Sequence, residues 1–100
     1  MVIEGYQFQG PYDKTGFLQE RSGVYVILDL RRDGNYVIDV GESEALKTRI
    51  ENHNRKNCWR RNEQGTLAVA VHYTPQFPKS LRRAIEQKIR SQYVPVCGIL

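Results

Sequence analysis

The sequence contains no long hydrophobic run. No stretch is long and apolar enough to cross a bilayer, and the first residues, which include Glu4 and Gln7, do not have the form of a signal peptide. We therefore expect no membrane partner and a cytoplasmic location. Internal repeats, linkers and low-complexity segments are also missing, so the 100 residues should form one domain, residues 1–100, with a modest core.

Cysteine is scarce in this chain. Cys58 and Cys97 are the two cysteines, and no close cysteine pair accompanies His53 or His72 in a zinc-binding pattern. A structural zinc site is therefore not expected. The two cysteines could pair with each other, but in a cytoplasmic protein we expect them to be reduced thiols.

Positive charge is nearly absent from residues 1–20, which hold one lysine and no arginine. The basic residues are concentrated in two later blocks, and the formal net charge is +4. The blocks consist of Lys47, Arg49, Arg55, Lys56, Arg60 and Arg61, and of Lys79, Arg82, Arg83, Lys88 and Arg90. Such clustering is typical of surfaces that contact phosphates; the alternative is that both blocks are solvated helix faces.

Two apolar segments joined by a turn signal predict a β-hairpin. Residues 23–30 are apolar at nearly every position, which indicates a central strand. Residues 31–35 contain Asp-Gly, a typical hairpin turn, and residues 36–40 form the returning strand. Antiparallel pairing should bring Tyr25 and Asp39 toward the same end of the hairpin.

The residues after the hairpin have the apolar spacing of a helix. Ser43 is a plausible N-cap for a helix whose Leu46 and Ile50 face the sheet, with Arg49 beside this apolar stripe. Residues 58–62 then predict a basic loop.

A further strand and helix complete the pattern. Residues 65–73 alternate between larger and smaller apolar side chains, and Ser80 can cap a helix from Leu81 to about Gln92. Residues 1–20 add a short strand and a loop. The sequence thus predicts an α/β (α+β) fold, a small three-stranded, mostly antiparallel sheet flanked by helices.

Several residues at the ends of these elements form a recognisable order. Gly23-Val24-Tyr25 lies on the first hairpin strand, and Asp39-Val40-Gly41 lies on the returning strand. Gly41-Glu42-Ser43 then opens a helix that carries Leu46, Arg49 and His53, and the later helix supplies Glu86, followed by Tyr93 and Pro95. In this order and spacing the chain resembles the GIY-YIG nuclease family over about residues 22–98.

The resemblance implies a role for each of these residues in hydrolysing a phosphodiester. Tyr25 would help to activate the attacking water, and His53 would help to orient or deprotonate. Arg49 would stabilise charge on the scissile phosphate, and Glu86 would bind one Mg²⁺ (or Mn²⁺). Such chemistry needs a charge clamp and a positioned water, and one or two carboxylates suffice for Mg²⁺ because the ion keeps several waters.

Two positions depart from the family pattern. Asp39 stands where the second motif usually has tyrosine, and no asparagine stands near Cys97, where the family has one. An ionised carboxylate only accepts hydrogen bonds, so it cannot replace a phenol directly. Asp39 is either a second metal ligand or water-orienting base beside Glu86, or an ion-pair partner of Arg49 or Lys47.

The basic residues around the predicted loop offer a candidate nucleic-acid surface. The residues assigned to it are Lys47, Arg55, Lys56, Trp59, Arg60 and Arg61. Trp59 could stack on a base or anchor the loop by packing. Tyr25 could likewise be a core residue, and Glu86 could pair with Arg82 or Arg90 within its helix.

We predict a metal-dependent endonuclease acting on nucleic acid, with DNA ahead of RNA. Its candidate catalytic residues are Tyr25, Asp39, Arg49, His53 and Glu86, and its candidate metal ligands are Glu86 and Asp39. The chain has no room for a separate target-recognition domain, so specificity would come from loops, a partner protein or a homodimer. Two alternatives stay open: a catalytically silent nucleic-acid-binding domain, and a protein-interaction or regulatory module.

Overall fold

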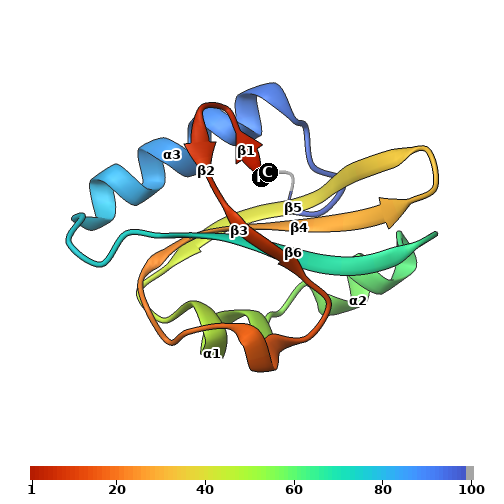
Figure 1. Ribbon diagram of the computed structural model, residues 1–100, viewed down its shortest axis with the longest axis horizontal. Coiled ribbons are helices and arrows are strands. Elements are labelled where there is room, and N and C mark those ends of the chain that lie inside the picture. The colour runs from red at the N-terminus through yellow and green to blue at the C-terminus, as the bar shows by residue number, and fades with distance from the viewer. Residues whose placement is uncertain (99–100) are drawn as a thin grey trace.

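A central antiparallel sheet lies between two layers of helices and loops in the computed structural model, which describes residues 1–98 (Figure 1). The elements are, in chain order, β1 (Val2–Ile3), β2 (Tyr6–Gln7), β3 (Gln9–Tyr12), a 3₁₀ turn η1 (Thr15–Phe17), β4 (Gly23–Arg31), β5 (Gly34–Ser43), α1 (Leu46–Glu51), α2 (Lys56–Arg61), β6 (Thr66–Tyr73) and α3 (Lys79–Gln92). The predicted α+β class is confirmed.

The main sheet has the strand order β3-β6-β4-β5, and each neighbouring pair is antiparallel. β4 is central, as its apolar sequence predicts: Tyr25 pairs with Gly41 of β5 and with Val71 of β6. The sheet has four strands rather than the predicted three because β3 pairs with β6. β3 is four residues long and contains Gly10 and Pro11, so it shows none of the alternation by which a strand is recognised.

A β-bulge shifts the register of β5. Asp39 lies opposite Ile27, while Val37 lies opposite Leu28, so Ile38 is the extra residue. As a result Ile38 and Asp39 both lie on the face of the sheet that packs against α1 and α2.

Each face of the sheet carries its own apolar core. The face toward α1 and α2, which we call the α1/α2 face, buries Leu18, Tyr25, Ile27, Ile38, Leu46, Ile50, Trp59, Val69, Val71 and Cys97. The opposite face, which we call the α3 face, buries Ile3, Phe8, Val24, Val26, Leu28, Val40, Ala70, Ile85 and Ile89. β4 contributes to both cores, which explains why its sequence is apolar at consecutive positions.

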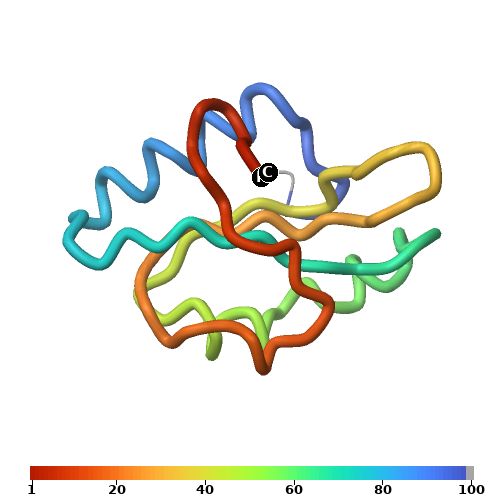
Figure 2. The backbone as a smooth tube through the Cα atoms, viewed as in Figure 1, coloured from red at the N-terminus to blue at the C-terminus, as the bar shows by residue number. Residues whose placement is uncertain are grey.

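The first twenty residues cross from one face to the other (Figure 2). The β1–β2 hairpin lies on the α3 face, where Ile3 and Phe8 are buried. The chain then joins the sheet as β3, and Leu18 is buried on the α1/α2 face. This segment therefore closes both cores rather than forming a peripheral loop.

The helices begin at positions that differ from the predicted ones. Ser43 ends β5, its hydroxyl accepts a hydrogen bond from the Ala45 N–H (3.0 Å), and α1 begins at Leu46. α3 begins directly after Pro78, two residues earlier than a Ser80 cap would place it. Much of the predicted basic loop is the helix α2, whose six residues are too few to show a helical period.

The two cysteines form a disulfide, which corrects the prediction of reduced thiols. The bond joins Cys58 of α2 to Cys97 of the C-terminal tail, with a Cα–Cα distance of 6.0 Å. The Cys97 N–H also donates to the carbonyl oxygen of Ile38 (2.9 Å), at the bulge in β5. Cysteine number and an expected compartment could not show that the bulge and α2 bring the two residues together. Within residues 1–98, no helix is long and apolar enough to cross a membrane.

Candidate functional site

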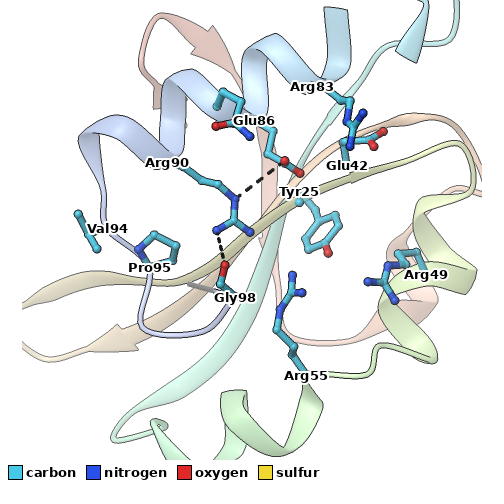
Figure 3. Close-up of a pocket in the computed structure, with 12 residues that line it drawn as sticks. Tyr25, Glu42, Arg49, Arg55, Arg83, Glu86, Arg90, Val94, Pro95 and Gly98 are labelled. Atoms are coloured by element: carbon cyan, nitrogen blue, oxygen red, sulfur yellow. Dashed lines mark hydrogen bonds and ion pairs between the residues drawn. The ribbon is translucent and has the colours of Figure 1, made fainter. Parts of the chain in front are cut away.

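A cavity of about 430 Å³ opens beside β5, where α3, the C-terminal tail and the segment from α1 to α2 meet (Figure 3). Its wall includes Tyr25 of β4, Arg49 of α1, Arg55 ahead of α2 and Glu86 of α3. Three of the five predicted catalytic residues therefore line one cavity. The other two, Asp39 and His53, lie behind it, in contact with residues of its wall.

Tyr25 reaches the cavity because Gly41 leaves room for its ring. The two residues are opposite each other on β4 and β5, and a Cβ at Gly41 would overlap the hydroxyl end of the Tyr25 side chain. Any other residue at Gly41 would displace the phenol. Glycine is therefore needed at position 41 so that the Tyr25 side chain can occupy its observed position.

Tyr25 and His53 form a buried, uncharged pair. The Tyr25 hydroxyl oxygen lies 2.6 Å from Nε2 of His53. Burial raises the pKa of Tyr25 to about 12, and the Asp39 carboxylate adds to the rise. Burial lowers the pKa of His53 to about 4, helped by the positive charges of Arg49 and Arg55. Near pH 7 both side chains are therefore neutral.

Asp39 is fully buried behind the cavity. Its carboxylate accepts hydrogen bonds from Nε and Nη2 of Arg55 (2.7 and 3.2 Å) and from Nη2 of Arg90 (3.3 Å). The indole N–H of Trp59 and the backbone N–H of Val40 (both 2.8 Å) complete the set. Two guanidinium groups and two neutral donors thus compensate for the burial of this charge.

These contacts bear on both sequence-based interpretations of Asp39, and they correct the ion-pair partners. Its oxygens are engaged in five hydrogen bonds and it does not line the cavity, so it does not fit the predicted role of second metal ligand or base. The ion-pair interpretation has the right interaction but the wrong partners. Those partners are Arg55 and Arg90, instead of Arg49 or Lys47.

Four arginines surround the cavity. Arg49 and Arg55 approach from the α1 and α2 side, whereas Arg83 and Arg90 approach from α3 (Figure 3). Arg49 is steadied by a hydrogen bond from its Nη2 to Oδ1 of Asn54 (3.2 Å). Guanidinium groups on opposite sides of one cavity favour an anionic group with several oxygen acceptors, such as a phosphate.

Glu86 is the half-buried carboxylate that faces these charges. It lies 4.0 Å from Nε of Arg90 and makes no hydrogen bond within residues 1–98. Burial raises its pKa, and the nearby carboxylate of Glu42 acts in the same direction, although Arg90 opposes the rise. Glu42 is itself held by Nε of Arg82 (3.1 Å).

The carboxylates at the cavity suit one divalent ion that keeps its water ligands better than an ion enclosed by protein ligands. The described part of the chain contains no cluster of three or more metal-binding side chains. A carboxylate without hydrogen-bond donors can nevertheless hold Mg²⁺, because that ion keeps most of its water ligands. Glu86 fits this description and Asp39 does not.

The predicted nucleic-acid surface lies mostly outside the cavity. Of its members, Arg55 lines the cavity. Trp59 is 5% exposed and is bound to Asp39, so it packs in the core and is not available to stack on a base. The members that do not line the cavity are Lys47, Lys56, Trp59, Arg60 and Arg61.

Sequence reasoning did not assign Glu42, Arg83 or Arg90 to the site. Arg83 and Arg90 lie three residues before and four residues after Glu86, so all three share one side of α3. That spacing was a usable signal. Glu42 is placed by the length of β5, which continues beyond the predicted strand as far as Ser43.

No protein-family model, curated protein or solved structure matches this chain.

Proposed function

We propose that this chain is a nuclease, a divergent relative of the GIY-YIG type, that hydrolyses phosphodiester bonds in nucleic acid. The observation that carries the proposal is the convergence of a neutral phenol, arginines and a half-buried carboxylate in one cavity. These groups belong to Tyr25, Arg49, Arg55 and Glu86. They are drawn from four separate segments of the chain, which supports a functional rather than a local structural reason for their meeting.

Each of these residues would have a separate role in phosphodiester hydrolysis. Arg49 and Arg55 would bind the non-bridging phosphate oxygens and stabilise the charge that develops on them. Tyr25 would make a hydrogen bond from the inner wall of the cavity. In the reaction a water oxygen bonds to phosphorus and the bond from phosphorus to the leaving oxygen breaks, and the proton that the water gives up is balanced by the proton that the leaving oxygen gains.

Glu86 is the residue that would hold a divalent ion such as Mg²⁺ or Mn²⁺. When bound, the ion supplies positive charge and orientation beside the phosphate. Asp39 would act differently, by keeping Arg55 and Arg90 in place. DNA remains the preferred substrate class, with a partner protein or a second copy of the chain assisting target recognition.

The proposal is tested with the purified protein, single-stranded, duplex and branched DNA and RNA, and Mg²⁺ or Mn²⁺. We expect cleavage, and a loss of about 10²- to 10³-fold in rate for Arg49→Ala, which removes a charge-stabilising donor. Glu86→Gln should lower the rate and weaken its dependence on the metal concentration. The matched control is Glu44→Gln, because the Glu44 side chain is 84% exposed and outside this cavity. Equal rates for the wild-type protein and Glu86→Gln would remove the metal-binding role.

A catalytically silent nucleic-acid-binding domain is the second candidate. The observation that favours it is the structural engagement of Asp39, which leaves no second phenol at this site. The four arginines would still bind phosphates. This candidate predicts binding that weakens steeply with salt and no turnover with either metal. Affinity that does not change with salt would exclude it.

A further inference from the structure

The two histidines of the chain are held by opposite kinds of hydrogen-bond partner. Nδ1 of His53 lies 3.0 Å from the backbone nitrogen of Arg55, with its N–H directed at the ring. Nδ1 of His72 lies 2.8 Å from the carbonyl oxygen of Gln7. A backbone N–H only donates and a carbonyl oxygen only accepts. His53 must therefore present a bare Nδ1, whereas His72 must present a protonated one.

The bare Nδ1 of His53 determines where its ring proton lies. A neutral imidazole carries one proton, and with Nδ1 engaged as an acceptor that proton is on Nε2. Nε2 is the atom that lies 2.6 Å from the Tyr25 hydroxyl oxygen. The hydrogen bond therefore runs from His53 to Tyr25, and the phenol oxygen is its acceptor.

The direction of this bond leaves the proton of Tyr25 without a protein acceptor. Within residues 1–98, His53 is the hydrogen-bond partner of the Tyr25 hydroxyl. The hydroxyl end of the ring lies toward the space between Arg49 and Arg55 (Figure 3). An oxygen that enters this space, from a phosphate or from a water, would meet both guanidinium groups and the phenolic proton.

We infer that His53 is a positioning residue which, by donating to Tyr25, turns the phenol into a hydrogen-bond donor aimed into the cavity. This inference rests on the proposed function in naming the acceptor, a phosphate oxygen or a water bound beside it. It keeps the orienting role that the family resemblance implies for His53, but neither Tyr25 nor His53 takes a proton from the attacking water. The Tyr25 donor instead adds to the charge stabilisation provided by Arg49 and Arg55.

The surroundings of the pair keep it in this state. Arg49 and Arg55 place positive charge near His53, and its ring lies 4.6 Å from that of Trp59, which leaves little access for water. If Nδ1 were protonated, its N–H and the backbone N–H of Arg55 would point at each other, and neither could accept a hydrogen bond. Both the charges and the backbone contact thus oppose a second ring proton.

The test is a long-range ¹H–¹⁵N correlation spectrum of the histidine rings in the wild-type protein at pH 7. We expect His53 to be protonated at Nε2 with an unprotonated Nδ1, and His72, as an internal control, to be protonated at Nδ1. Protonation of His53 at Nδ1 would overturn the inference. The spectrum needs no substrate, so it is decided separately from the nuclease proposal, which fails only if nothing is cleaved.

A Tyr25→Phe variant separates the two contacts of His53. The Nε2 proton should shift and exchange faster because its acceptor is gone, while Nδ1 should stay unprotonated because the Arg55 N–H remains. A change of tautomer in this variant would contradict the assigned role of Arg55. In the active protein, Tyr25→Phe should lower cleavage by about 10²-fold, as loss of such a donor does. The double variant Tyr25→Phe/His53→Gln should then cleave only slightly more slowly than Tyr25→Phe alone. If the rate losses of the two single variants multiply in the double variant, His53 does not act through Tyr25.

Discussion

The α3 face and the α1/α2 face of the sheet bury side chains of different chemistry. The core of the α3 face is an apolar cluster that extends from Val24 on β4 to Ile89 on α3, with the buried Arg82 on the same side of that helix. On the α1/α2 face, an apolar core of similar size surrounds the buried polar groups of Asp39 and His53. The same strands therefore stabilise the fold with one set of side chains and hold a polar network with the other.

The comparison shows what polar groups require in a small core. On the α1/α2 face, Asp39 and His53 each have partners fixed by backbone or arginine contacts, so their burial is compensated. On the α3 face, Arg82 of α3 is also buried, and its Nε donates to Glu42 (3.1 Å), so this charge has a partner as well. The cavity forms at the β5 edge, where Glu86 and Arg90 of α3 meet the polar network of the other face.

The largest expected effect comes from removing the charge of Asp39. Asp39→Asn should lower the free energy of unfolding by about 3–5 kcal/mol, because Arg55 and Arg90 lose a buried partner. It should also weaken nucleic-acid binding. The matched control is Asp29→Asn, which is equally buried but accepts from Arg31 and from backbone N–H groups away from the cavity. Urea unfolding and binding assays would separate the two, and unchanged binding by folded Asp39→Asn would contradict its positioning role.

Truncating a core side chain on the α3 face should affect stability without affecting the site. Ile89→Ala removes a fully buried side chain and should cost about 2–5 kcal/mol of unfolding free energy. Cleavage per folded molecule should stay at the wild-type rate, since Ile89 does not line the cavity. Leu81→Ala on the same helix is the control, because Leu81 is 47% exposed and should change stability by less than about 0.5 kcal/mol. A loss of cleavage by folded Ile89→Ala would show that the two faces are not separable.

Crowding the space beside Tyr25 should damage the site more than the fold. Gly41→Ala places a methyl group where the phenol lies and should cost about 1–3 kcal/mol as an overpacking substitution. Cleavage and the ring signals of His53 should change with it. Gly16→Ala serves as the control, because a Cβ at Gly16 would meet nothing within 4 Å. An active Gly41→Ala protein would mean that Tyr25 has no part in the reaction.

The buried neutral His53 predicts a stability loss in mild acid. Its pKa is about 4 in the folded protein and near 6.5 when unfolded, so protons bind preferentially to the unfolded chain between these values. Its contribution is complete above pH 6.5 and declines by up to about 1.4 kcal/mol per pH unit as the pH falls toward 4. Glu86, with a raised pKa, acts in the opposite direction. Unfolding midpoints of wild-type and His53→Gln proteins at pH 7 and pH 5 isolate the histidine; an identical pH response would contradict its burial as a neutral group.

The smallest effect on stability is expected for Arg83, an exposed residue at the rim of the cavity. Arg83→Ala should change the unfolding free energy by less than about 0.5 kcal/mol. It should reduce the slope of binding affinity against salt concentration by about one, as for a lost phosphate contact. Arg61→Ala on α2 should leave that slope unchanged. If the Arg83→Ala and wild-type proteins show the same dependence of affinity on salt, Arg83 does not contact a phosphate of the nucleic acid.

Elements with strong local signals were predictable from the sequence. The hairpin was recognisable because residues 23–30 are apolar at nearly every position and the turn contains Asp33 and Gly34. The strand β6 and the helix α3 also follow their alternating and helical patterns, with ends displaced by one or two residues. β3 and α2 were not predicted because they are short and are stabilised by packing rather than by a repeating pattern.

The site was predictable in its members more than in their roles. Tyr25, Arg49 and Glu86, which the family resemblance had grouped together, line the cavity. The partners of Asp39 could not be predicted, because Arg55 and Arg90 lie 16 and 51 residues away in the sequence. Such contacts depend on the bulge in β5 and on the path of the C-terminal tail, which no local pattern encodes.

The contacts around Asp39 also affect how the molecule meets other chains. β5 forms one edge of the sheet, and an edge strand of ten residues offers backbone groups that can pair with a foreign strand. At Val40, however, the N–H is bound by Asp39 and the carbonyl oxygen by Arg90, while the carbonyl oxygen of Ile38 is bound by Cys97. These side chains and the tail therefore close the middle of β5 to strand addition. Releasing the tail would remove the Cys97 contact and make this edge more prone to intermolecular β-pairing.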